Sequence, residues 1–231
     1  MSDKKNVEEL SNSDELVIAK AKDFWGKYSK PLVAVSTVII LAIGGYYVYQ
    51  NFFKKPQDVK GAEVIWKAEE YFRMDSVNLA LNGDGQNWGF LKVIDKYGGT
   101  DAGNMASFYA GSCYIKLNDN DKAIKYLKKF SSDSKPIQAR AYKLLGDAYG
   151  DLGKNSDALS YYKKAAAHFE KDEASSAEYL FSAAYFADRV MKDSKEAVSL
   201  YKELKEKFPN TAQGREVDSY LAQLGVYSTN N

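Results

Sequence analysis

The feature that most constrains this chain is an internal repeat with a period of 35 residues. The segment FYAGSCYIKLNDNDKAIKYLKKF at 108–130 superposes on YKLLGDAYGDLGKNSDALSYYKKA at 142–165. Self-similarity at such a period indicates units that each form one supersecondary element and bury their apolar face only by stacking on their neighbours. The superposed positions are Gly111 on Gly146, Tyr114 on Tyr149, Ala123 on Ala158 and Tyr126 on Tyr161.

The residue types at the repeated positions suit two antiparallel helices in each unit. Gly146 and Ala158 would lie where the two helices cross, because only a very small side chain lets the backbones approach closely. Tyr149 and Tyr162 would fill the space around that contact. This pattern resembles the tetratricopeptide repeat, with a large residue, Leu-Gly and Tyr on the first helix and Ala followed by an aromatic residue on the second. The matching residues are Tyr142, Leu145, Gly146, Tyr149, Ala158 and Tyr162.

Further units continue the pattern on both sides. Ala197 in KEAVSLYKELKEKFPNT corresponds to Ala158 at an offset of 39 residues, and Pro209 takes the place of the closing proline of the repeat. We expect the four extra residues to lengthen the first helix of that unit or the loop after it. Upstream, WGFLKVIDKYGGT resembles a second helix with Gly89 at the small position. The expected domain covers 61–231, with a divergent unit at 61–100, repeats at about 104–138, 139–173 and 174–210, and a capping helix at 211–225.

A run of 23 residues without a formal charge, 31–53, precedes the repeats. A helix of this length measures about 34 Å and can cross a hydrocarbon core of about 30 Å once. Aromatic residues and lysines flank both ends, as expected at the two membrane interfaces. The sequence therefore predicts an all-α chain in which a single N-terminal transmembrane helix at 31–53 is followed by a linker at 54–60 and a tetratricopeptide-repeat α-solenoid. The alternatives are a cleaved signal peptide, for which Ala42 and Gly44 supply small residues, and a buried core helix.

The charged tail at 1–30 has its own pattern. Val17, Ala21, Phe24, Trp25 and Tyr28 recur at the spacing of one helix face, which suggests a short interfacial helix; a disordered tail is the alternative. Four lysines lie close to each end of the uncharged run, so the positive-inside rule gives no orientation. We expect this short tail to stay in the cytoplasm and the repeats to lie outside it.

Composition and motifs argue against nucleic-acid binding, metal binding and catalysis. Lys and Arg number 32 against 31 Asp and Glu, so there is no basic field to attract nucleic acid. Cys113 and His168 are the only residues of their kinds, which leaves no disulfide, zinc site or triad. Asp84 lies in the loop NGDGQNWG, but Val93 stands where an EF-hand needs its glutamate, so we expect a structural turn. We expect no enzyme activity, no catalytic residue, no cofactor, no metal and no small-molecule substrate.

A solenoid of helix pairs presents a concave face lined by the first helices, and such faces hold peptides or partner helices. The residues expected there are Phe108, Ser112, Lys143 and Asp147. Asp147 lies one helical turn from Lys143 and would pair with it. That carboxylate would also repel an incoming carboxyl terminus, which argues against a ligand of that class. An ordinary solvated solenoid face is the alternative for all four residues.

The overall arrangement resembles the YfgM-like family of bacterial membrane proteins: a charged tail, then DFWGKYSKP leading into one membrane helix, then repeats. The resemblance implies a cytoplasmic-membrane protein with periplasmic repeats, associated with the Sec translocon and with periplasmic chaperones of the prolyl isomerase type. Its partners would be proteins, including chaperones or secreted clients. The alternatives are a scaffold for another cell-envelope complex and an enzyme whose site the sequence does not reveal.

Overall fold

The computed structural model describes residues 2–227 of the chain. It divides into two compact units, one up to Pro56 and one from Gln57 onward. The first contains helix α1 (Ser2–Val48) and the π-helical turn η1 (Tyr49–Lys54). The second contains all the other elements: α2 (Lys55–Arg73, which begins just before the division), α3 (Val77–Asn82), α4 (Phe90–Tyr97), α5 (Asp101–Lys116), α6 (Asn120–Leu127), α7 (Lys135–Asp151), α8 (Asn155–His168), α9 (Glu173–Phe186), the π-helical turn η2 (Ala187–Met191), α10 (Ser194–Lys207) and α11 (Ala212–Gln223).

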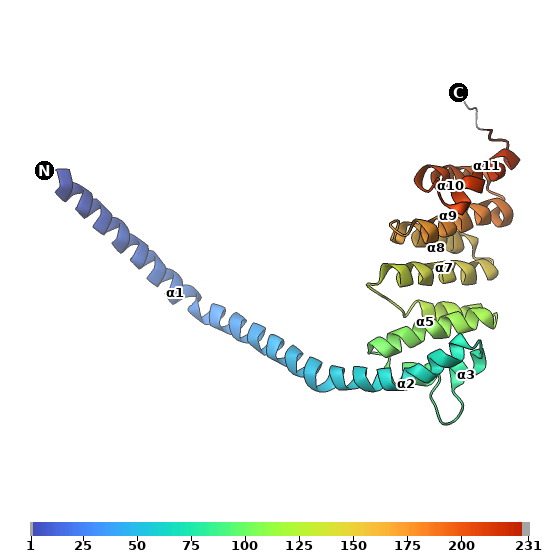
Figure 1. The fold of residues 1–231 in the computed structure, drawn as a ribbon. Helices are drawn as coiled ribbons and strands as arrows, with labels where there is room; N and C mark the ends of the chain where they lie inside the picture. The colour runs from blue at the N-terminus through green and yellow to red at the C-terminus, as the bar shows by residue number, and fades with distance from the viewer. Residues whose placement is uncertain (1, 228–231) are drawn as a thin grey trace. The chain divides into compact units, whose positions relative to one another are not determined.

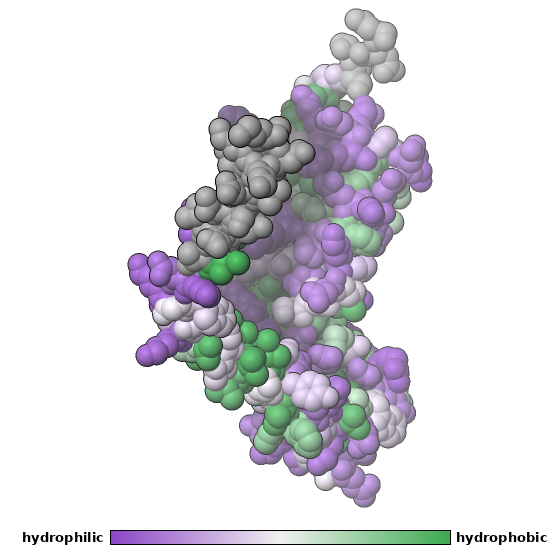
Figure 2. All heavy atoms as spheres, turned by 90° about the vertical axis from the view of Figure 1, so that its left-hand side faces the viewer, coloured by the Kyte–Doolittle hydropathy of each residue, from purple (hydrophilic) through white to green (hydrophobic). Residues whose placement is uncertain are grey.

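Residues 31–48 of the uncharged run lie in α1 and residues 49–53 lie in η1, and the continuous helix to which they belong is long and apolar enough to cross a membrane. No side chain of its most apolar stretch is buried, and Ile40 and Leu41 are among its most exposed residues. A helix that is apolar on all sides and covered by nothing is unstable in water and stable in lipid. Figure 2 shows part of this hydrophobic surface in green. The helix continues on both sides of the run, so 54–60, expected as a linker, is helical as well.

The second unit is an all-α solenoid of stacked helix pairs, which confirms the predicted fold class. Helices α5 and α6, α7 and α8, and α9 and α10 form successive pairs, each stacked on the next, and α11 packs at the C-terminal end (Figure 1). Within the described residues the only β-type pairing is an isolated bridge between Gly83 and Trp88. The core runs through the stack as one continuous cluster, from Ile65 in α2 to Leu221 in α11.

Each pair turns in the same way between its two helices. The residue before the second helix's N-cap is left-handed in all three pairs: Asn118 has φ 56°, Gly153 φ 68° and Lys192 φ 58°. Asp119 and Asp193 then cap α6 and α10 by accepting hydrogen bonds from backbone N–H groups at distances of 3.2 and 3.0 Å. These turns place the buried alanines Ala123, Ala158 and Ala197 four residues after the respective caps.

The repeated spacing of small residues within the chain reflects a close approach of the two helices in each pair. A Cβ atom on Gly111 would lie 2.5 Å from Cγ of Leu127, and one on Gly146 would lie 2.6 Å from Cδ1 of Tyr162. Both members of this contact shift by 35 residues from one unit to the next, so the period of the sequence is the period of the packing. Only glycine fits at these two positions without displacing the facing side chain.

The interval from Ala158 to Ala197 has four more residues than the repeat period, and the structure places these extra residues differently from what the sequence led us to expect. The cap of α9, Asp172, lies 14 residues after Ala158, whereas the cap of α7, Ser134, lies 11 residues after Ala123. Three of the four extra residues therefore extend α8 and the loop that follows it. The fourth is absorbed by η2, where the helix widens into a π-helical turn before α10.

The N-terminal unit departs from the predicted register at Gly89. This residue is the N-cap of α4 and does not lie inside a helix; four residues further on, buried Val93 occupies the place that alanine takes in the other units. A Cβ on Gly89 would overlap the carbonyl oxygen of Leu81, because the backbone bridge between Gly83 and Trp88 brings these two chain segments together. Glycine is thus needed here for a tight loop rather than for a helix crossing.

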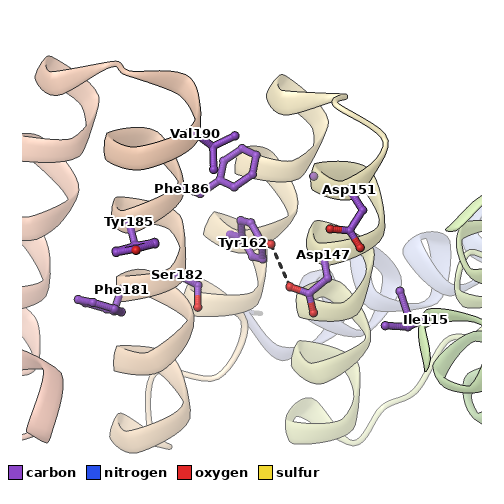
Figure 3. A pocket seen from close by; sticks show the side chains of 10 residues that line it. Ile115, Asp147, Asp151, Tyr162, Phe181, Ser182, Tyr185, Phe186 and Val190 are labelled. Atoms are coloured by element: carbon purple, nitrogen blue, oxygen red, sulfur yellow. Dashed lines mark hydrogen bonds between the residues drawn. The ribbon is translucent and has the colours of Figure 1, made fainter. Parts of the chain in front are cut away.

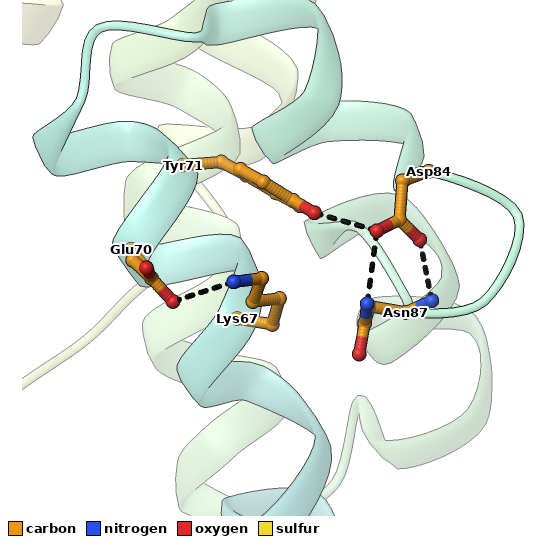
Figure 4. Close-up of polar contacts among 5 residues, drawn as sticks. All are labelled: Lys67, Glu70, Tyr71, Asp84 and Asn87. Carbon is orange, nitrogen blue, oxygen red and sulfur yellow. Dashed lines mark hydrogen bonds and ion pairs between the residues drawn. The ribbon is translucent and has the colours of Figure 1, made fainter.

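That loop is held by Asp84, whose carboxylate accepts four hydrogen bonds. Figure 4 shows those that come from Tyr71 and Asn87. The donors are the backbone N–H groups of Gln86 and Asn87, the Asn87 side-chain amide and the Tyr71 hydroxyl, at 2.6 to 2.9 Å. The Asn87 backbone and the Tyr71 hydroxyl hold the pKa of the Asp84 carboxyl well below its usual range. An acceptor bonded in this way is a turn-forming residue, as the sequence predicted.

Candidate functional site

A hollow of the solenoid lies between α7 and α9, on the face formed by the first helices of the pairs (Figure 3). We call this the helix-A face and this hollow the α7–α9 groove. Its volume is about 590 Å³, and it opens to solvent. The lining residues are Ile115 from α5, Asp147, Gly150 and Asp151 from α7, Tyr162 from α8, Phe181, Ser182, Tyr185 and Phe186 from α9, and Val190 from η2.

One wall of the α7–α9 groove carries two carboxylates. Asp147 accepts a hydrogen bond from the buried Tyr162 hydroxyl at 2.9 Å and pairs with Lys143 Nζ at 2.9 Å. Burial and the neighbouring Asp147 charge raise the pKa of Tyr162, so its hydroxyl stays a donor. Asp151 accepts a longer bond of 3.3 Å from the Asn120 amide. The carboxylate of Asp147 is therefore fixed in place, whereas that of Asp151 retains capacity to accept further donors.

The opposite wall is aromatic and apolar. Tyr185 and Val190 are 45% and 51% exposed, which is high for large side chains that lie in a hollow. The Phe181 ring stacks on Tyr185 with 5.9 Å between centroids. Phe186 is buried and closes the floor, where a Cβ on Gly150 would lie 3.0 Å from its ring. An apolar wall facing a carboxylate wall suits an amphipathic segment with an apolar anchor and a donor group beside it.

The structure separates the four residues expected on the concave face. Phe108 is 6% exposed, and its ring lies 5.1 Å from that of Phe130 in the core. Ser112 is 8% exposed and donates to the Phe108 carbonyl within α5. Lys143 and Asp147 are partly exposed and form the ion pair expected from their spacing. Of the four, therefore, Lys143 and Asp147 offer polar groups to a partner, while Phe108 and Ser112 pack inside.

Sequence reasoning missed most of the groove. Ile115 comes from α5, whereas Ser182 and Tyr185 come from α9, and these residues meet only because the pairs stack. Their signal was weak: Tyr185 lies in YLFSAAYFADRV, a segment whose apolar residues occur all round the helix. Nothing in that segment distinguishes an exposed tyrosine from the buried Tyr179.

A second hollow of about 570 Å³ lies between α2 and α5 on the same helix-A face. Exposed Val59 and Trp66 form its apolar part. Asp58, Glu69 and Asp101 surround them, and burial raises the pKa of Glu69. Both hollows thus combine exposed apolar side chains with carboxylates, which gives the helix-A face one chemical character at two places.

Nothing among the described residues assembles a metal or nucleophilic centre. No group of three or more His, Cys, Asp or Glu side chains in that part of the chain could hold a metal ion. Cys113 is buried in α5, where burial raises the pKa of its thiol to about 12 and disfavours the reactive thiolate. His168 packs edge-on against Tyr142 at the end of α8, with 5.3 Å between ring centroids. Both residues have structural surroundings.

Comparison with known families agrees with this architecture. The family model for the tetratricopeptide repeat matches residues 105–133 and 178–211. The first segment covers most of α5 and α6, and the second covers much of α9 together with α10. No curated protein matches the chain. The fold, the helix-crossing glycines and the matched segments together show that the chain contains tetratricopeptide repeats and one helix able to span a membrane.

Proposed function

We propose that this chain is a membrane-anchored interaction protein that binds a protein partner in the α7–α9 groove. The observation that carries the proposal is the exposed apolar wall of Tyr185 and Val190 opposite Asp147 and Asp151. Proteins seldom leave large apolar side chains exposed in a hollow without a binding role. The tetratricopeptide repeats support binding of proteins over catalysis, and α1 supplies an anchor.

The binding test uses two matched arginine substitutions. Ser182→Arg places a long side chain in the groove, whereas Ser199→Arg places the same side chain on the exposed surface of α10. We expect Ser182→Arg to weaken partner binding at least about tenfold, because the anchor residues of a partner would lose their site. Ser199→Arg should bind like the unchanged protein. Pull-down from detergent-solubilised membranes, with melting temperatures of both variants, provides the measurement; equal binding by both variants would move the site elsewhere.

At finer detail we propose an ancillary role at the Sec translocon, with periplasmic chaperones or secreted clients as partners. The resemblance of the tail, anchor and repeat order to the YfgM-like family supports this role. A scaffold for another cell-envelope complex is the second candidate, since the groove suits either. The two candidate roles are separated by identifying the proteins that bind to Ser199→Arg but not to Ser182→Arg. Translocon subunits or chaperones among them would support the role at the Sec translocon, and subunits of another envelope complex would support the scaffold.

The orientation proposed is an N-terminus in the cytoplasm and a periplasmic solenoid in a bacterial cytoplasmic membrane. A short tail of about 30 residues needs no translocation if it stays inside. Protease added to spheroplasts should digest the solenoid and leave a small membrane-bound fragment that contains Trp25. Protection of the solenoid until the membrane is broken would show the inverse topology and remove the periplasmic role.

A further inference from the structure

The tetratricopeptide repeat produces a second surface, away from the α7–α9 groove, made of tyrosine pairs. Tyr114 of α5 stacks on Tyr126 of α6 with 5.5 Å between centroids and 8° between planes. Tyr149 of α7 stacks on Tyr161 of α8 with 5.4 Å and 7°. The two pairs differ by one repeat period, so successive units build the same stacked pair side by side along α5 to α8.

Six lysines extend over these rings. Lys122 lies 5.2 Å from the Tyr114 centroid and is also paired with Asp119. The other five form no such pair within the described part of the chain. We call them, with the tyrosines, the Lys–Tyr face. All five side chains belong to exposed residues. The distances from Nζ to ring centroid are 5.7 Å for Lys125 and 5.5 Å for Lys129 over Tyr126, 5.3 Å for Lys128 and 5.8 Å for Lys154 over Tyr149, and 5.6 Å for Lys164 over Tyr161.

These five lysines differ from other lysines of the solenoid that form ion pairs with carboxylates. Lys122 pairs with Asp119 at 2.6 Å and Lys163 with Glu196 at 2.8 Å. By contrast, none of the five lysines takes part in an ion pair within residues 17–227. The segment 119–129 has four lysines against two aspartates, and α8 with its N-cap has three lysines against one aspartate, in a chain whose net charge is only +1.

Several carboxylates of the solenoid lie away from these lysines: Asp147 and Asp151 line the α7–α9 groove, and Asp58 and Glu69 line the hollow at α2. Asp157 lies close enough to interact with Lys128 and Tyr161. The Lys–Tyr face therefore carries an excess of ammonium groups. A surface of one sign attracts a ligand of the other sign over about one Debye length, roughly 8 Å at physiological salt.

The short tether of the solenoid identifies which anionic surface is always within reach. The uncharged run ends at Phe53, and the first buried residue of the solenoid is Gly61. Eight helical residues span about 12 Å at 1.5 Å per residue. Anchoring at that distance gives a membrane surface a high effective concentration for the solenoid, so weak attraction is enough for docking. Tyrosine rings and lysine stems also suit the headgroup region, where one end of a side chain is apolar and the other is wet.

We propose that the Lys–Tyr face docks on anionic phospholipid headgroups of the membrane in which α1 is anchored. The ammonium groups meet lipid phosphates while the tyrosine rings support the lysine stems. This docking leaves the α7–α9 groove out of the contact, because no residue of that groove belongs to the Lys–Tyr face. The inference rests on the proposed anchor and is independent of which protein the groove binds.

The test measures lysine acylation in the full-length protein reconstituted into nanodiscs. Reconstitution itself tests the anchor; acylation rates, read by mass spectrometry, test the docking. We expect Lys128, Lys154 and Lys164 to react at least about threefold more slowly in discs with anionic lipid than in zwitterionic discs, and the difference to vanish at high salt. Lys195 and Lys202, exposed on α10 and over no ring, should react equally in both.

Two charge-matched variants complete the test. Replacement of Lys125, Lys128 and Lys129 by glutamine should abolish the protection of Lys164, whereas the same replacement of Lys171, Lys195 and Lys202 should leave it intact. Equal acylation of the Lys–Tyr face in both kinds of disc overturns the proposal. It is also overturned if anionic lipid gives no protection and an added polyglutamate peptide does, because the face would then accept an acidic polypeptide.

Discussion

Gly146→Leu is expected to lower the free energy of unfolding of the solenoid by about 3 kcal/mol, the upper range for overpacking a core. The first added carbon alone would lie 2.6 Å from Cδ1 and 2.7 Å from Cε1 of Tyr162. The ring cannot simply turn away, because its hydroxyl is bonded to Asp147. The α7 and α8 backbones must therefore separate, and the contacts of the neighbouring pairs loosen with them.

The measurement is urea and thermal unfolding of a fragment that starts near Lys55, followed by circular dichroism. A loss of about 3 kcal/mol corresponds to a melting temperature roughly 10 °C lower for a domain of this size. Gly99→Leu is the matched control, because a Cβ at Gly99 meets nothing within 4 Å. An unchanged melting temperature for Gly146→Leu would show that this glycine is not at a helix crossing, and a spectrum dominated by strand would reject the fold.

Deletion of residues 31–53 is expected to convert the protein from a membrane-bound to a soluble form. The deleted stretch holds most of the exposed large apolar side chains of α1, including Ile40 and Leu41, and their transfer into lipid would be the main force holding the chain at a membrane. The solenoid should keep its helical spectrum, since its core lies between Ile65 and Leu221. Fractionation of cells into membrane and soluble parts, with alkaline carbonate washing, provides the measurement.

Deletion of residues 2–24 removes the same number of residues and serves as the control. It leaves the uncharged run intact, so this variant should stay in the membrane fraction and resist the alkaline wash. If the variant lacking 31–53 also sediments with membranes, another part of the chain binds them. If both variants are soluble, the run does not act as an anchor.

The repeats were predictable because packing imposes one residue type at fixed spacing. Ala123, Ala158 and Ala197 all follow their helix caps at the same distance, so the pattern survives in the sequence as a period. The turn before each cap was not predicted. Its left-handed residue is Gly153 in one unit but Asn118 and Lys192 in the others, and lysine gives no hint of that conformation.

The prediction for Gly89 in the N-terminal unit was wrong because glycine can serve either at a helix crossing or in a tight loop. Gly89 has the spacing expected of a helix-crossing residue, yet the structure uses it for the backbone bridge at Gly83 and Trp88. Sequence spacing cannot distinguish the two uses. The tight loop becomes evident only with the hydrogen bonds that gather on Asp84.

For the candidate site, local spacing predicted the pair that a single helix makes. Lys143 and Asp147 lie one turn apart on α7 and form the expected ion pair. Phe108 was misplaced because an apolar residue on a first helix can face either the groove or the next helix. Its burial against Phe130 depends on the angle between stacked units, and no residue of α5 by itself encodes that angle.

The most direct measurement of the central claim is site-specific photo-crosslinking in intact cells. A photoreactive phenylalanine at the position of Tyr185 lies on the exposed wall of the α7–α9 groove, and one at the position of Lys202 lies on the exposed surface of α10. The account predicts discrete crosslinked protein partners from position 185 and none of the same partners from position 202. Partners that crosslink from position 202 and not from position 185 would contradict it.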